Sequence, residues 1–172
     1  VLQECVKIFS MKRRTFIAFS ATSPFFLNIH AYAKEIPTDV WEVIESVQNI
    51  LFPKTEQMPS AKDINALFYL VSNSSSEYFD ANDLDLLIKG ASVFHQKFPD
   101  FLHQDTESKN KTLEIASKNE YLETWLSRLI YYTIEAMFSD PLYGGNLKEM
   151  GWNSINHNIG YPRPIKPYGE KI

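Results

Sequence analysis

The 172-residue sequence contains a single cysteine, Cys5, which lies just before an N-terminal segment that has the pattern of an export signal. If that segment is removed after export, the remaining chain has no thiol. Disulfide bonds, thiolate nucleophiles, covalent c-type haem attachment and cysteine-ligated iron–sulfur clusters are then excluded. Any redox cofactor would be held without cysteine or by another subunit.

Catalytic and metal-binding motifs are also missing. The acidic run at residues 80–85 has leucine and aspartate where an EF-hand loop needs an oxygen ligand and a glycine, so it is interpreted as a solvated first helical turn. Gly144-Gly145 is no dinucleotide fingerprint, and no Gly-x-Ser-x-Gly motif occurs. The spacing that places two metal ligands on one helix face is absent around His95, His103 and His157. The sequence therefore predicts no catalytic, cofactor-binding or metal-binding residue in this chain.

Long apolar runs and basic clusters are scarce. The segment from Thr15 to Ile29 is interrupted by polar residues and is shorter than the roughly 20 apolar residues that span a bilayer. After residue 33 the chain has 13 basic and 20 acidic residues, a formal charge of −7. This acidic balance argues against nucleic acid and against an anionic membrane surface as a partner.

The N-terminal segment does contain a recognisable pattern. Two arginines precede an apolar stretch that closes on a small-x-small sequence, which is typical of a twin-arginine export signal. The signal is predicted over residues 11–33, with residues 1–10 as an upstream extension. Its defining residues are Arg13, Arg14, Phe16, Ala31 and Ala33. The alternative interpretation is a basic surface patch beside a buried helix.

Apolar residues recur at helical spacing through most of the remaining chain. Helices are predicted over residues 40–51, 64–71 and 81–94, weakly near 113–115, and over 121–137. Ser60 to Asp63 resembles a capping box for the second helix, and Asp80 and Asn119 are predicted caps of later ones. No alternating strand pattern is found. The sequence thus predicts an all-α fold, a small bundle of about four to five helices over residues 34–138, with residues 121–137 as its central helix.

The composition changes after Phe138. Residues 139–172 are rich in glycine, proline and aromatic side chains, so they cannot be helical for long. The aromatic side chains need apolar surface to cover. This irregular tail is therefore expected to wrap over the bundle, or to dock on a partner with Tyr143, Trp152 and Tyr161 as aromatic anchors.

Three short stretches of the tail carry a family resemblance: residues 139–146, Gly151-Trp152 and Gly160-Tyr161-Pro162. Together they resemble the C-terminal signature of the gluconate 2-dehydrogenase subunit 3 family. Residues 47–53 and 61–66 are similar to that family's first helix and following turn. The sequence departs from the commonest pattern at residues 147–150 and 153–158.

The resemblance implies a non-catalytic small subunit of a periplasmic dehydrogenase complex at the outer face of the inner membrane. Its large partner would be a flavoprotein of the glucose-methanol-choline type that holds FAD, with haem in a multihaem cytochrome c subunit. The small subunit would carry the large subunit, which lacks a signal of its own, through the twin-arginine translocase and act in its maturation like a chaperone. The implied docking residues are Asp140, Pro141, Tyr143, Gly144, Gly145, Asn146, Gly151, Trp152, Gly160, Tyr161 and Pro162.

Two other functions remain open from the sequence. One is an independent periplasmic binding protein, which predicts a closed apolar pocket for a small ligand among the helices. The other is an enzyme without a cofactor, which predicts turnover by the isolated chain.

Overall fold

The computed structural model describes residues 38–166, and its regular elements there are all helical. The α-helices are α4 (Thr38–Leu51), α5 (Ala66–Ser74), α6 (Ala81–Lys97), α7 (Thr106–Ala116), α8 (Glu120–Phe138) and α9 (Met150–Ser154). Short 3-10 helices lie between them: η2 (Phe101–His103), η3 (Pro141–Tyr143) and η4 (Leu147–Glu149). Residues 38–166 contain no strand. The predicted all-α fold is confirmed.

The predicted export signal lies outside the described residues. Its residues Arg13, Arg14, Phe16, Ala31 and Ala33 all fall in the first of two units into which the chain divides, Val1–Ile36. Everything described below belongs to the second unit, Pro37–Ile172. The signal therefore stays a prediction.

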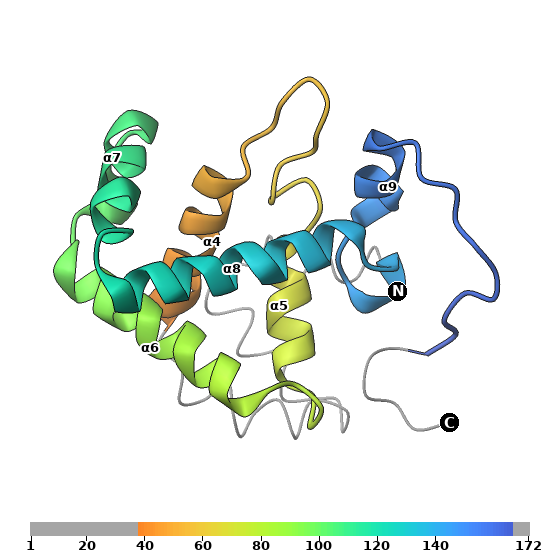
Figure 1. Ribbon diagram of the computed structural model, residues 1–172, viewed down its shortest axis with the longest axis horizontal. Helices are drawn as coiled ribbons and strands as arrows, with labels where there is room; N and C mark the ends of the chain where they lie inside the picture. The colour runs from red at the N-terminus through yellow and green to blue at the C-terminus, as the bar shows by residue number, and fades with distance from the viewer. Residues whose placement is uncertain (1–37, 167–172) are drawn as a thin grey trace, which may run out of the picture. The chain divides into compact units, whose positions relative to one another are not determined.

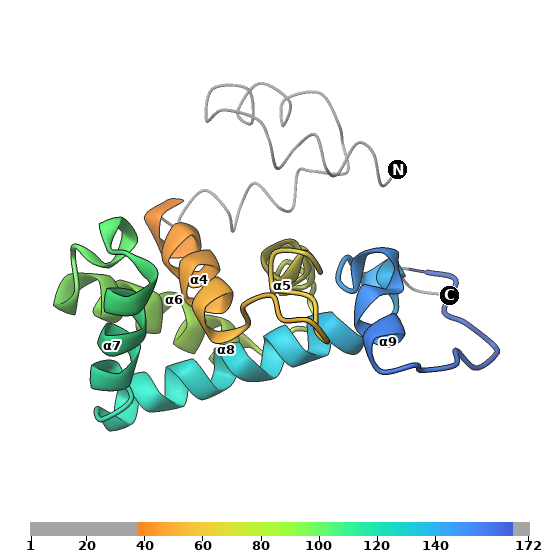
Figure 2. The ribbon, with the colours of Figure 1, turned by 90° about the horizontal axis from the view of Figure 1, so that it is seen from above.

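Helix α8 is the central packing element, as predicted. It contacts α4, α5, α6 and α9, and Figure 2 shows α4, α5 and α9 following one another along its length. Its buried side includes Leu122, Trp125 and Leu129, all without solvent exposure. The predicted apolar stripe was too broad, because Ile134 is 44% exposed. Nine residues separate Ile134 from Trp125, which at roughly 100° per residue places them on opposite sides of the helix.

Both predicted helix caps are confirmed. The Asp80 carboxylate accepts hydrogen bonds from the backbone N–H groups of Asn82 and Asp83, at 2.7 and 3.2 Å. The Asn119 side chain accepts one from the backbone N–H of Leu122 at 3.1 Å. Each cap satisfies a backbone donor that the first turn leaves without an intrahelical partner, and each contributes about 1 kcal/mol.

The core of the bundle is built around Trp125. Its indole N–H donates to the Leu87 carbonyl at 3.1 Å, and its ring lies 5.2 Å from the ring of Phe94. A Cβ atom at Gly90 would collide with the Trp125 ring. Glycine inside a helix costs about 0.5 to 1 kcal/mol relative to alanine, but here it lets α6 and α8 approach closely enough to enclose the indole.

The second helix starts later than predicted. Ser60 and Asp63 exchange the hydrogen bonds of the predicted capping box, both at 3.1 Å. The turn that they close ends at Asn65, whose φ of 59° lies in the left-handed region, and α5 begins only at Ala66. Ile64, predicted as helical, is fully buried in this turn instead. The capping box therefore folds a separate turn ahead of the helix.

The helix predicted near residues 113–115 starts earlier than its apolar pattern indicates. It begins at Thr106, because the Asp105 carboxylate accepts a hydrogen bond from the backbone N–H of Ser108 at 2.8 Å. Residues 106–112, its first two turns, are all polar, and so they lack the apolar spacing on which the prediction relied.

Candidate functional site

The residues of the tail signature fold against the C-terminal end of α8. We call residues 139–163 the C-terminal cap; it comprises η3, η4, α9 and the chain that follows them. Helix α9 contacts α8, and η3 contacts α5. Figure 1 shows α9 at the end of α8 that is opposite to α7. The tail therefore folds onto the bundle, which was one of the two predicted arrangements.

Asn146 holds the two halves of the cap together. The side chain is fully buried, and its amide N–H donates to the Ser139 carbonyl at 3.0 Å while its oxygen accepts from the Gly151 N–H at 2.8 Å. The backbone of Asn146 has a φ of 44°, in the left-handed region that asparagine tolerates better than most residues. The buried amide of Asn146 thus accepts a bond from the Gly151 N–H, five residues later, and donates one to the Ser139 carbonyl, seven residues earlier.

Glycines occur where the cap touches the backbone of α8. A Cβ atom at Gly145 would collide with the Ala136 carbonyl oxygen, and one at Gly151 with the Met137 carbonyl oxygen. Gly144 has a φ of 96°, which side chains rarely permit. These three signature positions are therefore explained by the fold of this chain alone.

Trp152 is an internal residue of the cap. It is 8% exposed, and its indole N–H donates to the Phe138 carbonyl at 2.8 Å. Phe138 is the last residue of α8, so the bond satisfies one of the carbonyls that a helix end leaves unpaired. Its predicted role as a partner anchor is untested, but its ring is already covered.

Arg163 fastens the end of the cap. Its guanidinium contacts the Asp140 carboxylate at 2.9 Å and the Glu149 carboxylate at 3.0 Å, and its centre lies 5.5 Å from the centroid of the Trp152 ring. The hydrogen bond to Asp140, followed by that to Glu149, raises the pKa of Arg163. We call Arg163 with these three partners the arginine clamp.

The sequence analysis missed Arg163. The only signal in the sequence was that Arg163 is the single arginine after residue 128. Asp140, predicted as a docking residue, has two roles inside the chain: it also accepts a hydrogen bond from the Leu142 N–H at 2.9 Å and so caps η3.

Other predicted docking residues face solvent. Tyr161 is 91% exposed and Pro162 is exposed, while a Cβ atom at Gly160 would meet open space. Ile165, which was not among the predicted docking residues, follows Arg163 by two residues and is 89% exposed. Pro141 and Tyr143 are half-buried. The structure thus divides the signature into buried residues that build the cap and exposed residues next to the clamp; contact of either group with a partner stays a prediction.

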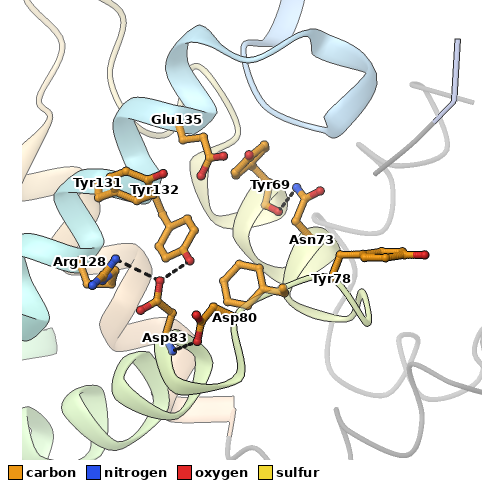
Figure 3. A pocket seen from close by; sticks show the side chains of 10 residues that line it. Tyr69, Asn73, Tyr78, Asp80, Asp83, Arg128, Tyr131, Tyr132 and Glu135 are labelled. Carbon is orange, nitrogen blue, oxygen red and sulfur yellow. Dashed lines mark hydrogen bonds and ion pairs between the residues drawn. The ribbon is translucent and has the colours of Figure 1, made fainter. Parts of the chain in front are cut away.

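A second candidate site is a hollow of about 270 Å³ between α5, the start of α6 and α8 (Figure 3). The Asp83 carboxylate accepts a hydrogen bond from the Tyr132 hydroxyl at 2.7 Å and pairs with Arg128 at 3.1 Å. Burial, with the bond to Asp83 adding to it, raises the pKa of Tyr132 well above its usual range. Burial also raises the pKa of Glu135, while a hydrogen bond from Tyr69 opposes the shift.

In residues 38–166, no group of three or more histidine, cysteine, aspartate or glutamate side chains is arranged to hold a metal ion. Over the same range, none of the helices combines the length and the apolar character needed to cross a membrane.

Comparison with known proteins gives one match. The family model described as Gluconate 2-dehydrogenase subunit 3 matches residues 38–160, from the first residue of α4 into the C-terminal cap. No curated protein and no solved structure matches the chain. The matched range includes the buried residues of the cap and stops one residue before Tyr161.

Proposed function

Because the chain belongs to the gluconate 2-dehydrogenase subunit 3 family, we propose that it is a non-catalytic small subunit of a flavin-dependent dehydrogenase complex. In this proposal it exports, matures and stabilises a large subunit of the glucose-methanol-choline type, whose FAD oxidises a sugar, a sugar acid or a polyol. A multihaem cytochrome c would take the electrons. The complex would lie in the periplasm, at the outer face of the inner membrane.

The observation that carries this proposal is the construction of the C-terminal cap. Asn146 and the arginine clamp hold irregular backbone in one conformation, and Tyr161 and Ile165 extend from it at 91% and 89% exposure. Exposed apolar side chains on a preorganised base lose little conformational entropy on binding. Aromatic residues are enriched among the side chains that dominate interface energies. The cap therefore suits a subunit that binds another protein.

The alternative function, an independent periplasmic protein that binds a small ligand, has less support. It predicts a closed apolar pocket, whereas the hollow next to α8 is open, is lined by carboxylates as well as aromatic rings, and measures about 270 Å³. Pockets that bury drug-sized ligands usually measure about 300 to 1,000 Å³.

Co-expression tests the proposal directly. The tagged full-length chain would be produced together with a flavoprotein of the glucose-methanol-choline type from the same genome, and both would be purified from the periplasm. We expect the two chains to co-purify with bound flavin and the flavoprotein alone to stay immature. A lone chain that is stable as a monomer, or that oxidises substrate without the flavoprotein, contradicts the proposal.

The export part of the proposal has its own test. Replacing Arg13 and Arg14 by lysine keeps the charge but removes the planar guanidinium donors, so both chains should accumulate in the cytoplasm. Lys12→Arg is the matched control and should leave export unchanged. If the flavoprotein still reached the periplasm with the double variant, the escort role would be wrong.

A further inference from the structure

The hollow beside α8 is lined by aromatic rings and carboxylates, and none of its lining residues belongs to the C-terminal cap. Tyr69 of α5, Phe79 of the connection to α6, and Tyr131 and Tyr132 of α8 supply aromatic walls. In Figure 3 the carboxylates of Asp83 and Glu135 lie among these rings. The Phe79 and Tyr132 rings stack with centroids 5.0 Å apart, so one wall is fixed by packing.

The charges of the hollow are unbalanced. Its lining carries three carboxylates, from Asp80, Asp83 and Glu135, and one cation, Arg128. Arg128 pairs with Asp83, and Asp80 accepts bonds from the backbone of α6. Among residues 38–166, no lysine or arginine ion-pairs with Glu135, whose side chain is exposed and accepts a hydrogen bond from Tyr69. The hollow therefore offers this carboxylate, which has no cationic partner among the described residues, to a cation from outside.

The same molecule already shows how it binds a guanidinium group. Arg163 lies over Trp152 between two carboxylates, and Arg128 lies 5.8 Å from the Tyr131 ring centroid while it contacts Asp83. A guanidinium is planar and weakly hydrated, so it can stack on a ring and bond a carboxylate at once. Glu135 with the neighbouring tyrosine rings repeats this combination without an arginine from the described part of the chain.

We propose that this hollow receives the guanidinium group of an arginine side chain from a partner polypeptide. The volume of about 270 Å³ is suited to one long side chain. At its edge, Tyr78 and Tyr131 are 54% and 55% exposed, and they can cover the aliphatic part of the incoming side chain. This inference rests on the proposed function, because it requires that the chain has a protein partner.

The binding site can be tested on the full-length chain with a small probe. Nα-acetyl-arginine methylamide would be titrated while the tyrosine ring signals are followed by NMR, with the citrulline analogue as a neutral probe of the same shape. We expect saturable shifts at Tyr69, Tyr131 and Tyr132, and binding of the citrulline analogue weaker by at least about fivefold. The lysine analogue should also bind more weakly, because it cannot stack as a plane.

Two variants make the test specific. Glu135→Gln removes the charge, and it should fold normally, because the amide has the same shape and keeps an oxygen that can accept the hydrogen bond from Tyr69. It should weaken the arginine probe by about threefold or more. Glu123→Gln, a matched loss of charge at an exposed position of α8 outside the hollow, should leave the affinity unchanged.

The inference is overturned if no saturable shift occurs, if the citrulline or lysine analogue binds as well as the arginine probe, or if the two variants behave alike. These failures are separable from that of the proposed function. A chain that co-purifies with the flavoprotein but ignores the probe loses only the arginine site. A chain that binds the probe but never joins a flavoprotein keeps the site and loses the proposed function.

Discussion

Two buried tryptophans allow the helical bundle to be compared with the C-terminal cap. The indole N–H of Trp125 donates to the Leu87 carbonyl and that of Trp152 to the Phe138 carbonyl, at 3.1 and 2.8 Å. Trp125 is enclosed by helices and by other aromatic rings. Trp152 is covered by a guanidinium and lies at a helix end. The bundle thus relies on apolar burial, and the cap relies on particular polar contacts.

The difference explains why the more specific part of the sequence signature lies in the cap and not in the helices. Apolar cores accept many side chains of similar volume, so their sequences vary widely while the pattern stays. No other residue reproduces the two bonds of the Asn146 amide together with its left-handed backbone. Gly145 and Gly151 are equally restricted, because any side chain would meet the backbone of α8.

The largest effect should follow from Trp125→Ala. The side chain is fully buried between α6 and α8, and its loss leaves a large cavity and removes the hydrogen bond to the Leu87 carbonyl. We expect the free energy of unfolding to fall by about 3 to 5 kcal/mol, measured by urea denaturation. Trp125→Phe is the control and should cost clearly less. If Trp125→Ala cost no more than the cap variants below, the bundle would not be the main source of stability.

A smaller loss is expected for Trp152→Ala. The side chain packs at the end of α8, so the free energy of unfolding should fall by roughly 2 kcal/mol, with the loss concentrated in the cap. Amide hydrogen exchange should show faster opening in residues 147–163 and unchanged protection in α6. Equal acceleration in both regions would show that cap and bundle unfold as one unit.

The success of sequence-based prediction follows the same division. The bundle was predictable because helical spacing and caps such as Asp80 and Asn119 are local signals that the structure confirms. The details of the cap were not, because Arg163 bonds residues 14 and 23 positions away. The signature identified the family, yet it could not separate buried residues such as Asn146 from exposed ones such as Tyr161. Whether a signature residue is buried depends on whether it lies on the side of the cap that faces α8.

The Asn146 amide gives the third prediction. Asn146→Ala leaves the Ser139 carbonyl and the buried Gly151 N–H without their partner, and should cost about 1 to 3 kcal/mol. Asn146→Asp keeps an acceptor for Gly151 but loses the donor to Ser139. Chemical denaturation should therefore show that the wild-type protein is the most stable of the three and that Asn146→Ala is less stable. Wild-type stability for Asn146→Ala would mean that these bonds do not hold the cap.

The arginine clamp should contribute less than Asn146, because the Arg163 side chain is 34% exposed. Exposed ion pairs contribute at most about 1 kcal/mol, and salt screens them. Arg163→Gln should lower the stability by that amount or less at low salt, with little difference at high salt. Lys148→Gln, at an exposed position of the cap, is the matched control for loss of one positive charge. A salt-independent loss would point to stacking on Trp152 as the main contribution.

The smallest change in stability, with the most informative result, is expected for Tyr161→Ala. Its side chain is 91% exposed, so the free energy of unfolding should change by no more than about 0.5 kcal/mol. If Tyr161 is a partner anchor, the same variant should weaken association with the flavoprotein by about 2 kcal/mol, measured as a dissociation constant. Tyr121→Ala, at an exposed tyrosine of α8 outside the cap, provides the control. Equal binding by both variants would place the partner contact elsewhere, because a side chain that is 91% exposed has little packing whose loss could mask the effect.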